Sequence, residues 1–503
     1  MPPPRRPDTL RRTVPSRSLR PLLAGVVALA LAAPVGCARN PVSGLPGIVL
    51  VSTQREIEIG QEEADKVEKS VGYVPDRPLQ RWVQEIGARL ARHSPRQDVE
   101  YRFYVLDMIE PNAFALPGGH VYVSRGLLAL VNSEDELACA LGHEIAHVAA
   151  RHSVQRVTVA TPFALALGVP TAVVGAVSEN LGGVLGGVSS LAAGVVIAPY
   201  SRQQEREADR VGLRIAADAG WDPGAMASFL RTLEREEELS RGGPRRQGFF
   251  DSHPSTPSRA RETAKAAESL EPAPRDAIAG DRDALLARLD GLLVGPNASQ
   301  GVFEETLFLH PTLGFAIRFP EGWQTASAAS YVAAADPADP DSVVVLQLAA
   351  EGHDPLAGAR ADGLKEDAAE RLERFEVDGR AAARFEGERR GSGFEITWVA
   401  HRGHVYRIVA TSPRDGFAQR RAAFRKVALS FHDLREEERA RIREDRLRAA
   451  RAEPGETLEA LIQRTGASWS AGEAAVANGI ETGTPLEAGH AIKVPIPTRY
   501  GTS

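Results

Sequence analysis

The stretch ALGHEIAHVAARHSVQR, residues 140–156, contains an H-E-x-x-H pattern. His143 and His147 are four residues apart, so on an α-helix they project from one face about one turn apart. Glu144 lies beside them. Two imidazoles can bind a metal while this carboxylate acts on the attacking water. We therefore predict a helix over 134–152 that carries a zinc site.

A catalytic zinc needs a third protein ligand and an open position. The metzincin pattern would place a glycine and a third histidine after the motif, but those positions hold Ala150 and Ser153. His152 is one residue out of phase with that pattern. We therefore assign His152 to the end of the helix, where a partly charged imidazole suits the helix dipole. The remaining solution is a glutamate from a later helix.

The segment YSRQQEREADRVG, residues 200–212, supplies the candidate glutamate. Glu205 and Asp209 are four apart on one helical face, so Glu205 can bind the metal while Asp209 accepts a hydrogen bond from a ligand imidazole. Glu207 points elsewhere. A run of solvated charges is the alternative interpretation of residues 202–210.

Three motifs in this order, LGHEIAHVAARH, SRQQEREADRVG and SHPSTPSR, resemble the HtpX/BepA branch of the gluzincin zinc metallopeptidases, which is related to the CAAX prenyl proteases. The segment CARNPVSGLPGIVLVSTQREIEIG is similar to the start of lipoprotein members of that family. The resemblance covers about residues 37–265. It implies a mainly α zincin-type peptidase domain with a small β-sheet over residues 37–270.

The same resemblance implies roles for the motif residues. His143, His147 and Glu205 would bind one Zn2+ per chain. Glu144 would be the general base, and Asp209 would support the site from behind a ligand.

Three further features match the family. His253 resembles a loop histidine that in periplasmic members can occupy the open zinc position and hold the enzyme latent, with a surface histidine as the alternative. Arg259 matches a family arginine that could stabilise the oxyanion, although an arginine at a helix start is usually solvated. The strand NAFALPGG, residues 112–119, resembles the edge strand to which an extended substrate adds. Asn112 and Ala113 are thus candidate subsite residues, unless this is a plain core strand.

The N-terminus begins with an Arg- and Pro-rich segment followed by the apolar run PLLAGVVALALAAPVGC, which ends at Cys37. This pattern predicts a signal peptide over residues 1–36 and export from the cytoplasm. The run is shorter than the roughly 20 residues of a membrane span, and a retained anchor is the alternative. Its end resembles a lipobox, which implies lipidation at Cys37 and, with Ala38 following, an outer-membrane lipoprotein facing the periplasm. A cut after Ala32 would instead leave a soluble periplasmic protein.

The composition of the 503 residues is ordinary for globular protein, with 43% hydrophobic residues, 25% charged residues and a net charge of -6. It gives no reason to expect a nucleic-acid partner. The length predicts about three domains plus linkers. The second cysteine, Cys139, is expected to be a small buried core residue.

The middle of the chain is less informative. Residues 157–198 are apolar and glycine-rich, and form either a transmembrane hairpin or two buried or membrane-surface helices. Residues 271–305 lose any pattern and predict a linker. Residues 306–433 predict an α+β domain with an antiparallel sheet, loosely similar to a PsbP-like fold and of unknown role. The mixed charges of 434–450 predict a charged helix or linker.

The last segment, residues 451–497, resembles a small LysM-like βααβ module. The resemblance rests on Pro-Gly-Glu-Thr-Leu at the start of a helix, on Asn478-Gly479 and on the final IKVP. LysM modules bind N-acetylglucosamine-containing glycans, so peptidoglycan is an implied partner. A small packing domain without a ligand is the alternative.

Together these features predict a zinc metalloendopeptidase of the bacterial cell envelope. It would act in protein quality control, hydrolysing exposed or misassembled envelope proteins with metal-activated water. The alternatives are an envelope assembly factor or chaperone, and a peptidoglycan-binding lipoprotein with a latent or vestigial peptidase site. The intact Glu144 favours the enzyme, because a scaffold has no need of a base there.

Overall fold

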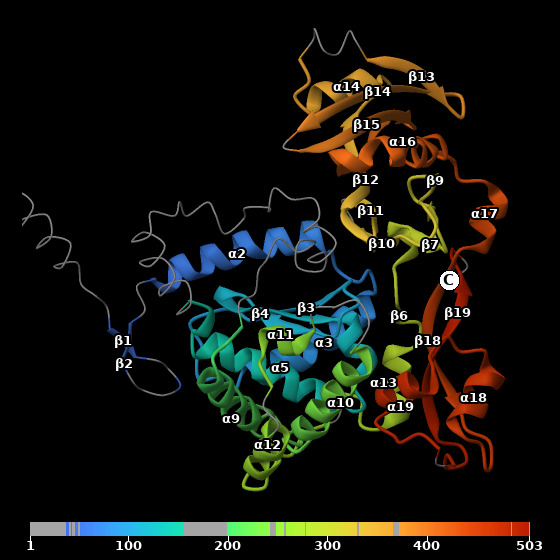
Figure 1. Cartoon of the computed structure of the whole chain (residues 1–503). Coiled ribbons are helices and arrows are strands. Elements are labelled where there is room, and N and C mark those ends of the chain that lie inside the picture. Colours follow the sequence, from blue (N-terminus) through green and yellow to red (C-terminus); the bar gives the residue numbers. More distant parts are fainter. Residues whose placement is uncertain are drawn as a thin grey trace, which may run out of the picture.

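The computed structural model describes residues 37–39, 42, 46–48, 51–154, 199–241, 248–255, 258–276, 278–328, 331–365, 372–389, 391–483 and 485–501. The expected signal peptide and the apolar segment 157–198 lie outside these residues. The chain folds into a mainly helical first domain followed by two β-rich parts (Figure 1). The predicted multidomain arrangement is confirmed in this coarse form. Among the described residues, no helix is both long and apolar enough to cross a bilayer.

The first domain packs helices around a three-stranded sheet. The larger helices are α2 (Thr53–Ser70), α3 (Arg77–Ala91), α5 (Glu134–Ala149), α9 (Arg202–Asp218) and α10 (Ala225–Ser240), with the shorter α12 (Arg259–Ala267) beside α9 and α10. The sheet has the order β3-β5-β4, with bounds Arg102–Leu106 for β3, His120–Ser124 for β5 and Ala113–Ala115 for β4. The edge strand expected at residues 112–119 is therefore present as β4.

The central helix of this domain is α5, which was predicted from the H-E-x-x-H pattern. Ser133 caps it by accepting a hydrogen bond from the backbone N–H of Glu136, and the acidic first turn suits the positive end of the helix dipole. Almost all of its side chains are buried, so α5 is enclosed by the rest of the domain. Cys139 is among them, as expected.

Two glycines bring α5 and α9 into backbone contact. A Cβ on Gly142 would lie 3.0 Å from the carbonyl oxygen of Gly212, and one on Gly212 would lie 2.8 Å from the backbone nitrogen of His143. No larger residue fits at this crossing without moving a helix. The close approach places the first turn of α9 directly against the histidine face of α5.

A buried ion-pair cluster fixes the end of α5. Glu56 of α2 accepts two hydrogen bonds from Arg96, at 2.8 and 3.0 Å, and one from Arg151, at 2.9 Å. Arg151 has the left-handed backbone angle φ 57°, which is unusual for a residue with a side chain. The cluster therefore holds the left-handed turn at Arg151 directly after α5, and this turn sets the direction of His152.

The second part contains the antiparallel sheet expected for 306–433. Its seven strands have the order β10-β11-β12-β16-β15-β14-β13, with bounds Gln324–Ala328, Tyr331–Asp336, Asp339–Glu351, His404–Pro413, Ser392–His401, Arg380–Arg389 and Glu373–Val377 in that order. Helices α16 (Arg414–Leu429) and α14 (Pro355–Ala361) cover opposite faces, since neighbouring residues of β15 pack into two separate cores. A smaller four-stranded sheet contains β7 (Val302–Glu304), β8 (Leu307–His310), β9 (Phe315–Arg318) and β17 (His432–Asp433).

The C-terminal module, residues 443–499, has the βααβ order expected from the sequence. It consists of β18 (Arg443–Arg451), α18 (Leu458–Thr465), α19 (Ala471–Asn478) and β19 (Ala491–Arg499), and β18 pairs with both β19 and the short β6 (Leu293–Val294). Residues 271–305, expected as a linker, thus contain β6 and also α13 (Arg282–Leu289).

The prediction of a charged helix or linker over residues 434–450 is partly wrong. Only α17 (Glu436–Arg441) is helical, and residues 443–450 belong to β18. The charges in this segment permit a helix, but long-range pairing with β19 and β6 decides for a strand. Glu444 and Leu447 are the buried members of that strand.

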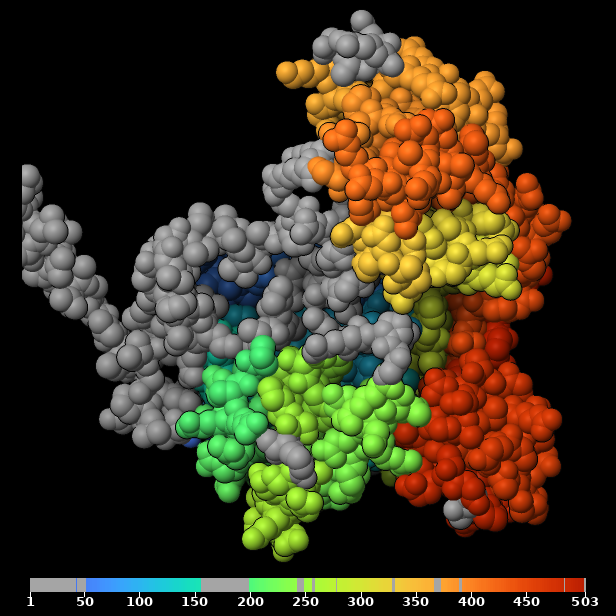
Figure 2. All heavy atoms as spheres, in the orientation of Figure 1, coloured from blue at the N-terminus to red at the C-terminus, as the bar shows by residue number. Residues whose placement is uncertain are grey.

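The C-terminal module packs tightly on the first domain. Helix α19 lies against α10 and the short α4 (Arg125–Leu130), and the two parts are in direct contact in the space-filling view (Figure 2). Lys493 of β19 is fully buried, and its ammonium donates to the carbonyl oxygens of Ala129 and Val131 at 2.9 and 2.7 Å. Arg235 of α10 donates to the carbonyl oxygen of Ile480 at 2.8 Å. The module and the first domain therefore share a buried, hydrogen-bonded interface.

Candidate metal centre

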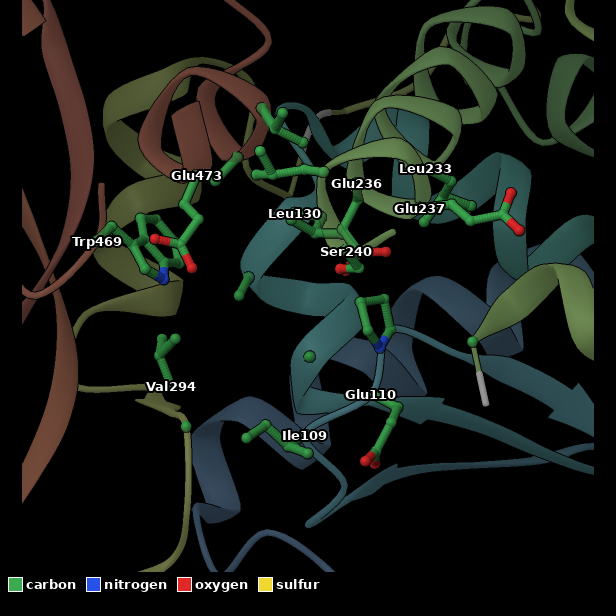
Figure 3. Close-up of a pocket in the computed structure, with 18 of the residues that line it drawn as sticks. Ile109, Glu110, Leu130, Leu233, Glu236, Glu237, Ser240, Val294, Trp469 and Glu473 are labelled. Carbon is green, nitrogen blue, oxygen red and sulfur yellow. The ribbon is translucent and has the colours of Figure 1, made fainter. Parts of the chain in front are cut away.

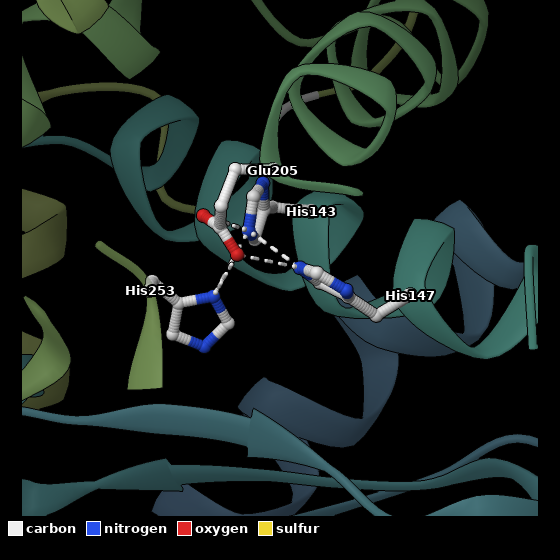
Figure 4. A group of neighbouring side chains, drawn as sticks. All are labelled: His143, His147, Glu205 and His253. Carbon is white, nitrogen blue, oxygen red and sulfur yellow. Dashed lines mark hydrogen bonds and ion pairs between the residues drawn. The ribbon is translucent and has the colours of Figure 1, made fainter. Parts of the chain in front are cut away.

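Four buried side chains from three elements converge on one point (Figure 4). His143 and His147 come from α5, Glu205 from the first turn of α9, and His253 from the residue after α11 (Phe249–Ser252). One ligand atom from each residue lies within 4.8 Å of the others. The sequence predicted all four, although they span more than a hundred positions of the chain.

The spacing between these atoms suits a metal ion. The Nε2 atoms of His143 and His147 are 3.0 Å apart, and the Oε1 atom of Glu205 lies 3.4 Å from His147 Nε2 and 3.1 Å from His253 Nδ1. A neutral imidazole has only one N–H, so three rings facing one another cannot satisfy every nitrogen by hydrogen bonding alone. Imidazole nitrogens with one carboxylate are a donor set that zinc accepts in tetrahedral geometry. The residues present therefore fit Zn2+, with His253 in the fourth position.

Asp209 and Arg259 hold two of the ligands from behind. Asp209 Oδ1 lies 3.0 Å from His143 Nδ1, which turns the Nε2 atom of that ring toward the cluster. Arg259 donates to both oxygens of Asp209 at 2.9 and 2.7 Å, and its Nη1 atom is 2.8 Å from Glu205 Oε2. Burial would raise the pKa of Asp209, but Arg259 and His143 outweigh it and hold that pKa below its usual value. Asp209 thus remains an anionic acceptor for the His143 ring.

The contacts of Arg259 do not test its expected role in stabilising the oxyanion. Its guanidinium is buried and engages Asp209, Glu205 and, at 3.4 Å, the carbonyl oxygen of His253. This arrangement favours a positioning role. Stabilisation of an oxyanion by Arg259 stays a prediction.

His152 flanks the end of α5, as expected, and its ring also contacts a ligand. Its Nδ1 atom lies 2.9 Å from His147 Nδ1, and its Nε2 atom lies 3.2 Å from Glu207 Oε2. When His147 Nε2 binds a metal, its Nδ1–H can donate to His152 Nδ1, and His152 Nε2–H can donate to Glu207. The three side chains thus form one hydrogen-bonded relay that fixes the His147 tautomer.

Helical periodicity could not have found this relay. The left-handed turn at Arg151 lies between α5 and His152, so the ring does not follow the helix that carries the motif. Tyr200 completes the surroundings by stacking on His147, with ring centroids 3.8 Å apart. The only signal in the sequence was the presence of His152 itself.

Burial and the neighbouring charges shift the pKa values of the ligand residues in different directions. Burial lowers the pKa of His143, but Asp209 and Glu205 outweigh it and raise that pKa to about 9. Burial moves the pKa of His147 well below its usual value. Burial would raise the pKa of Glu205, but His253, His143 and His147 hold it far below the usual range. Glu205 is therefore an anion at any working pH.

Glu144 is fully buried beside the cluster. Its Oε1 atom lies 3.4 Å from His253 Nε2, yet among the residues that the structure describes neither carboxylate oxygen accepts a hydrogen bond. Burial raises its pKa, which His253 and His143 partly counter. A buried carboxylate without hydrogen bonds costs stability. Such a group is suited to proton transfer, because its lone pairs are free for a water molecule.

These residues fall within a region that matches a known family. Residues 78–267 match Peptidase family M48. They form an M48 peptidase domain. The Beta-barrel assembly-enhancing protease of Escherichia coli (strain K12) is 28% identical over 234 residues, which are 44% of this chain and 46% of that protein. The Mitochondrial metalloendopeptidase OMA1 of Schizosaccharomyces pombe is 31% identical over 186 residues, 37% of this chain and 52% of that protein.

The chain spans about half the length of these curated relatives. Among solved structures, a cyanobacterial PsbP from Synechocystis sp. PCC 6803 is similar over 28% of this chain and 98% of that protein, at 18% identity and a TM-score of 0.21. A similarity of that size supports no statement about function. The M48 domain with its buried metal cluster is the part of the chain that the comparisons identify.

The two remaining candidates lie at the edge strand of the M48 domain. Ala113 begins β4, and Asn112 precedes it, with its backbone N–H donating to Ser124 Oγ at 2.9 Å. Both residues are largely buried. Their position at the start of an edge strand agrees with the expected geometry for strand addition. Their contact with substrate stays a prediction.

Proposed function

We propose that the chain is a zinc-dependent endopeptidase that cleaves exposed or misassembled proteins of the cell envelope. The observation that carries this proposal is the buried carboxylate of Glu144 beside the ligand set His143, His147 and Glu205. This carboxylate accepts no hydrogen bond from the described part of the chain. A purely structural metal site would have no use for such a costly group. The M48 match and the metalloendopeptidases among the relatives support the same activity.

The residues divide the chemistry between them. When bound, zinc would polarise the scissile carbonyl and lower the pKa of the attacking water. Glu144 takes a proton from that water and passes it to the leaving amine. The ring of His143 is held by Asp209 and that of His147 by His152, so both present Nε2 to the site. Fixed ligands reduce the reorganisation needed in the transition state.

His253 controls access in this proposal. It takes the fourth position and stacks on Phe249 with ring centroids 4.4 Å apart, so the substrate carbonyl has no place until the loop moves. The arrangement is that of a latent enzyme. The rival function, an assembly factor or chaperone with a permanently closed site, is supported by this same contact.

The test compares Glu144→Gln with the wild-type sequence in a His253→Ala background, using casein as substrate. We expect cleavage by His253→Ala and a loss of at least about 100-fold when Glu144→Gln is added, at equal zinc content. Equal inactivity of both proteins with zinc bound would overturn the proposal and favour the assembly factor.

We further propose that the protein is a lipoprotein of the outer membrane, anchored at Cys37 and facing the periplasm. The lipobox-like end of the expected signal peptide supports this placement. The similarity to a protease of E. coli that is named for enhancing β-barrel assembly supports it as well. Replacing Cys37 with Ser should move the protein from the membrane fraction to the soluble fraction. Unchanged fractionation would exclude the anchor.

We also propose peptidoglycan as a partner of the C-terminal module. The βααβ order of residues 443–499 supports a LysM-like module. The test is co-sedimentation of the full chain with purified sacculi, against a variant with Thr457→Ala and Leu486→Ala in the loops between strands and helices. Equal sedimentation of the two proteins would contradict peptidoglycan binding by the module.

A further inference from the structure

Three separate parts of the chain enclose a cleft of about 950 Å³ (Figure 3). One wall is the C-terminal half of α10, a second is the segment 293–296 that includes β6, and a third is the segment 468–477 of the C-terminal module. Leu130 of α4 and Leu233 of α10 add apolar side chains to the lining. The cleft exists only because the C-terminal module is packed on the first domain.

The cleft adjoins the catalytic machinery at two points. Residues 109–111 line it and lead directly into the edge strand β4, which begins at Ala113. Phe249 also lines it and stacks on His253, the fourth residue of the metal cluster. A polypeptide that lies along β4 and continues past the start of that strand therefore enters the cleft.

The lining has a strong excess of negative charge. Its carboxylates come from five separate segments of the chain, namely Glu110, Glu236, Glu237, Asp251, Asp445 and Glu473. Among the described residues of the lining, the cationic side chains are Arg125 and Arg241, and Arg125 is paired with Asp107 at 2.6 Å. Carboxylates on facing walls of a partly enclosed space attract cations more strongly than carboxylates on an open surface.

Apolar surface lies among these charges. Trp469 of the C-terminal module lies beside Glu473 and across the cleft from Glu110 and Glu236 (Figure 3). The side chains of Leu130 and Leu233 add further apolar surface to the lining. A long side chain with an apolar stem and a cationic head suits such a lining, because the stem can cover the apolar side chains while the head meets a carboxylate. Lysine and arginine are the side chains with this character.

We propose that this cleft is an extended substrate subsite that binds a polypeptide segment rich in lysine or arginine, beyond the residues that reach the metal. The inference rests on the proposed peptidase function and adds a substrate class to it. The C-terminal module then acts as a wall of the substrate channel.

The first experiment measures binding without cleavage. The full-length Glu144→Gln, His253→Ala protein with zinc is titrated against fluorescein-labelled 14-residue peptides built from Gly, Ser, Ala and Leu. The peptides carry three Lys in the N-terminal half, three Lys in the C-terminal half, three Glu, or no charge. We expect one Lys peptide to bind at least about tenfold more tightly than the Glu peptide at low salt, with the difference falling as salt rises.

Charge reversal locates the site of this preference. Glu236→Lys with Glu237→Lys should reduce the preference at least about fivefold, because two carboxylates of one wall become cations. Both positions lie in the last turns of α10, where lysine suits the helix dipole and the fold should persist. The matched control is Glu268→Lys with Glu271→Lys, which makes the same charge change at exposed positions outside the lining and should keep the preference.

Three results would overturn the proposal. The first is that neither Lys peptide binds more tightly than the Glu peptide. The second is that the control variant loses the preference for Lys peptides to the same extent. The third is that an N-acetylglucosamine tetramer displaces the Lys peptide, which would make the cleft a glycan site. Cleavage of the same peptides by the His253→Ala protein separates the two proposals. If Lys peptides bind preferentially but are not cleaved, the proposed peptidase activity is refuted and the proposed binding role of the cleft stands. If the peptides are cleaved without any preference in binding, only the proposed role of the cleft is refuted.

Discussion

At the scale of single residues, the relay through His152 leads to a measurable prediction. His152→Ala removes the acceptor for His147 Nδ1–H and should weaken zinc binding by about 10- to 100-fold. Competition with a chromogenic chelator measures this affinity directly. His152→Asn, whose side-chain oxygen can also accept, should restore part of it.

His93→Ala is the matched control, because His93 is an exposed histidine at the end of α3. It should bind zinc as the unchanged protein does. If His152→Ala matched this control, the relay would have no part in holding the ligand.

A second residue-scale prediction concerns pH. The carboxylates of Asp209 and Glu205 raise the pKa of His143 to about 9 in the metal-free protein despite burial. Below that pH zinc must displace a proton, so its apparent affinity should rise up to about tenfold per pH unit and level off above about pH 9. His147 adds no such step in this range, because burial keeps its pKa well below the usual value.

Chelator competition between about pH 6.5 and pH 10 measures this curve. Asp209→Asn removes one of the two charges, so the affinity of that variant should level off at a lower pH. A flat curve between about pH 7 and pH 9 would show that His143 is already deprotonated in the metal-free protein.

The sequence predicted the ligand set because spacing on a helix translates directly into geometry. His143 with His147, and Glu205 with Asp209, are pairs four apart, and the structure brings both pairs to one point. His152 escaped this reasoning because the direction of its ring depends on a strained turn at Arg151. That turn is held by Glu56, almost a hundred residues earlier, and no local pattern reports such a contact.

At the scale of elements, the crossing of α5 and α9 sets the distance between the two ligand pairs. Gly212→Ala should lower the free energy of unfolding by about 1–3 kcal/mol and weaken zinc binding, because the added Cβ would lie 2.8 Å from the backbone of His143. Helix propensity alone predicts the opposite sign, a gain of about 1 kcal/mol. Thermal unfolding with a zinc titration distinguishes the two.

Gly472→Ala in α19 is the control for this substitution. Its Cβ would meet the nearest side chain at an ordinary 3.4 Å, so the variant should be neutral or slightly more stable. Equal behaviour of the two variants would mean that the helix crossing relaxes freely and does not set the ligand geometry.

Elements were predicted well where their pattern is local and poorly where pairing is distant. Helix α5 has its cap and acidic first turn within four residues, and the structure agrees with the prediction. Strand β18 has the composition of a charged helix, and its conformation comes from β19, more than forty residues later, and from β6. Composition carries no information about either partner.

At the scale of the whole molecule, the packing of the C-terminal module has a consequence for how the chain unfolds. A module that served only as a tethered anchor would unfold independently of the M48 domain. Here Asn478 of the module accepts a hydrogen bond from Arg282 at 2.6 Å, in addition to the buried contacts of Lys493 with α4. The two parts should therefore unfold together.

Lys493→Met tests this coupling. Methionine preserves much of the side-chain volume but leaves the carbonyl oxygens of Ala129 and Val131 without their buried donor, which should cost about 1–3 kcal/mol. We expect the midpoint of thermal unfolding to fall by several degrees, for the module and for the M48 domain alike. Tryptophan fluorescence follows both, since Trp469 lies in the module and Trp221 in the core of the first domain. Lys265→Met, at an exposed position of α12, is the control, and an equal midpoint in both variants would mean that the domains are merely adjacent.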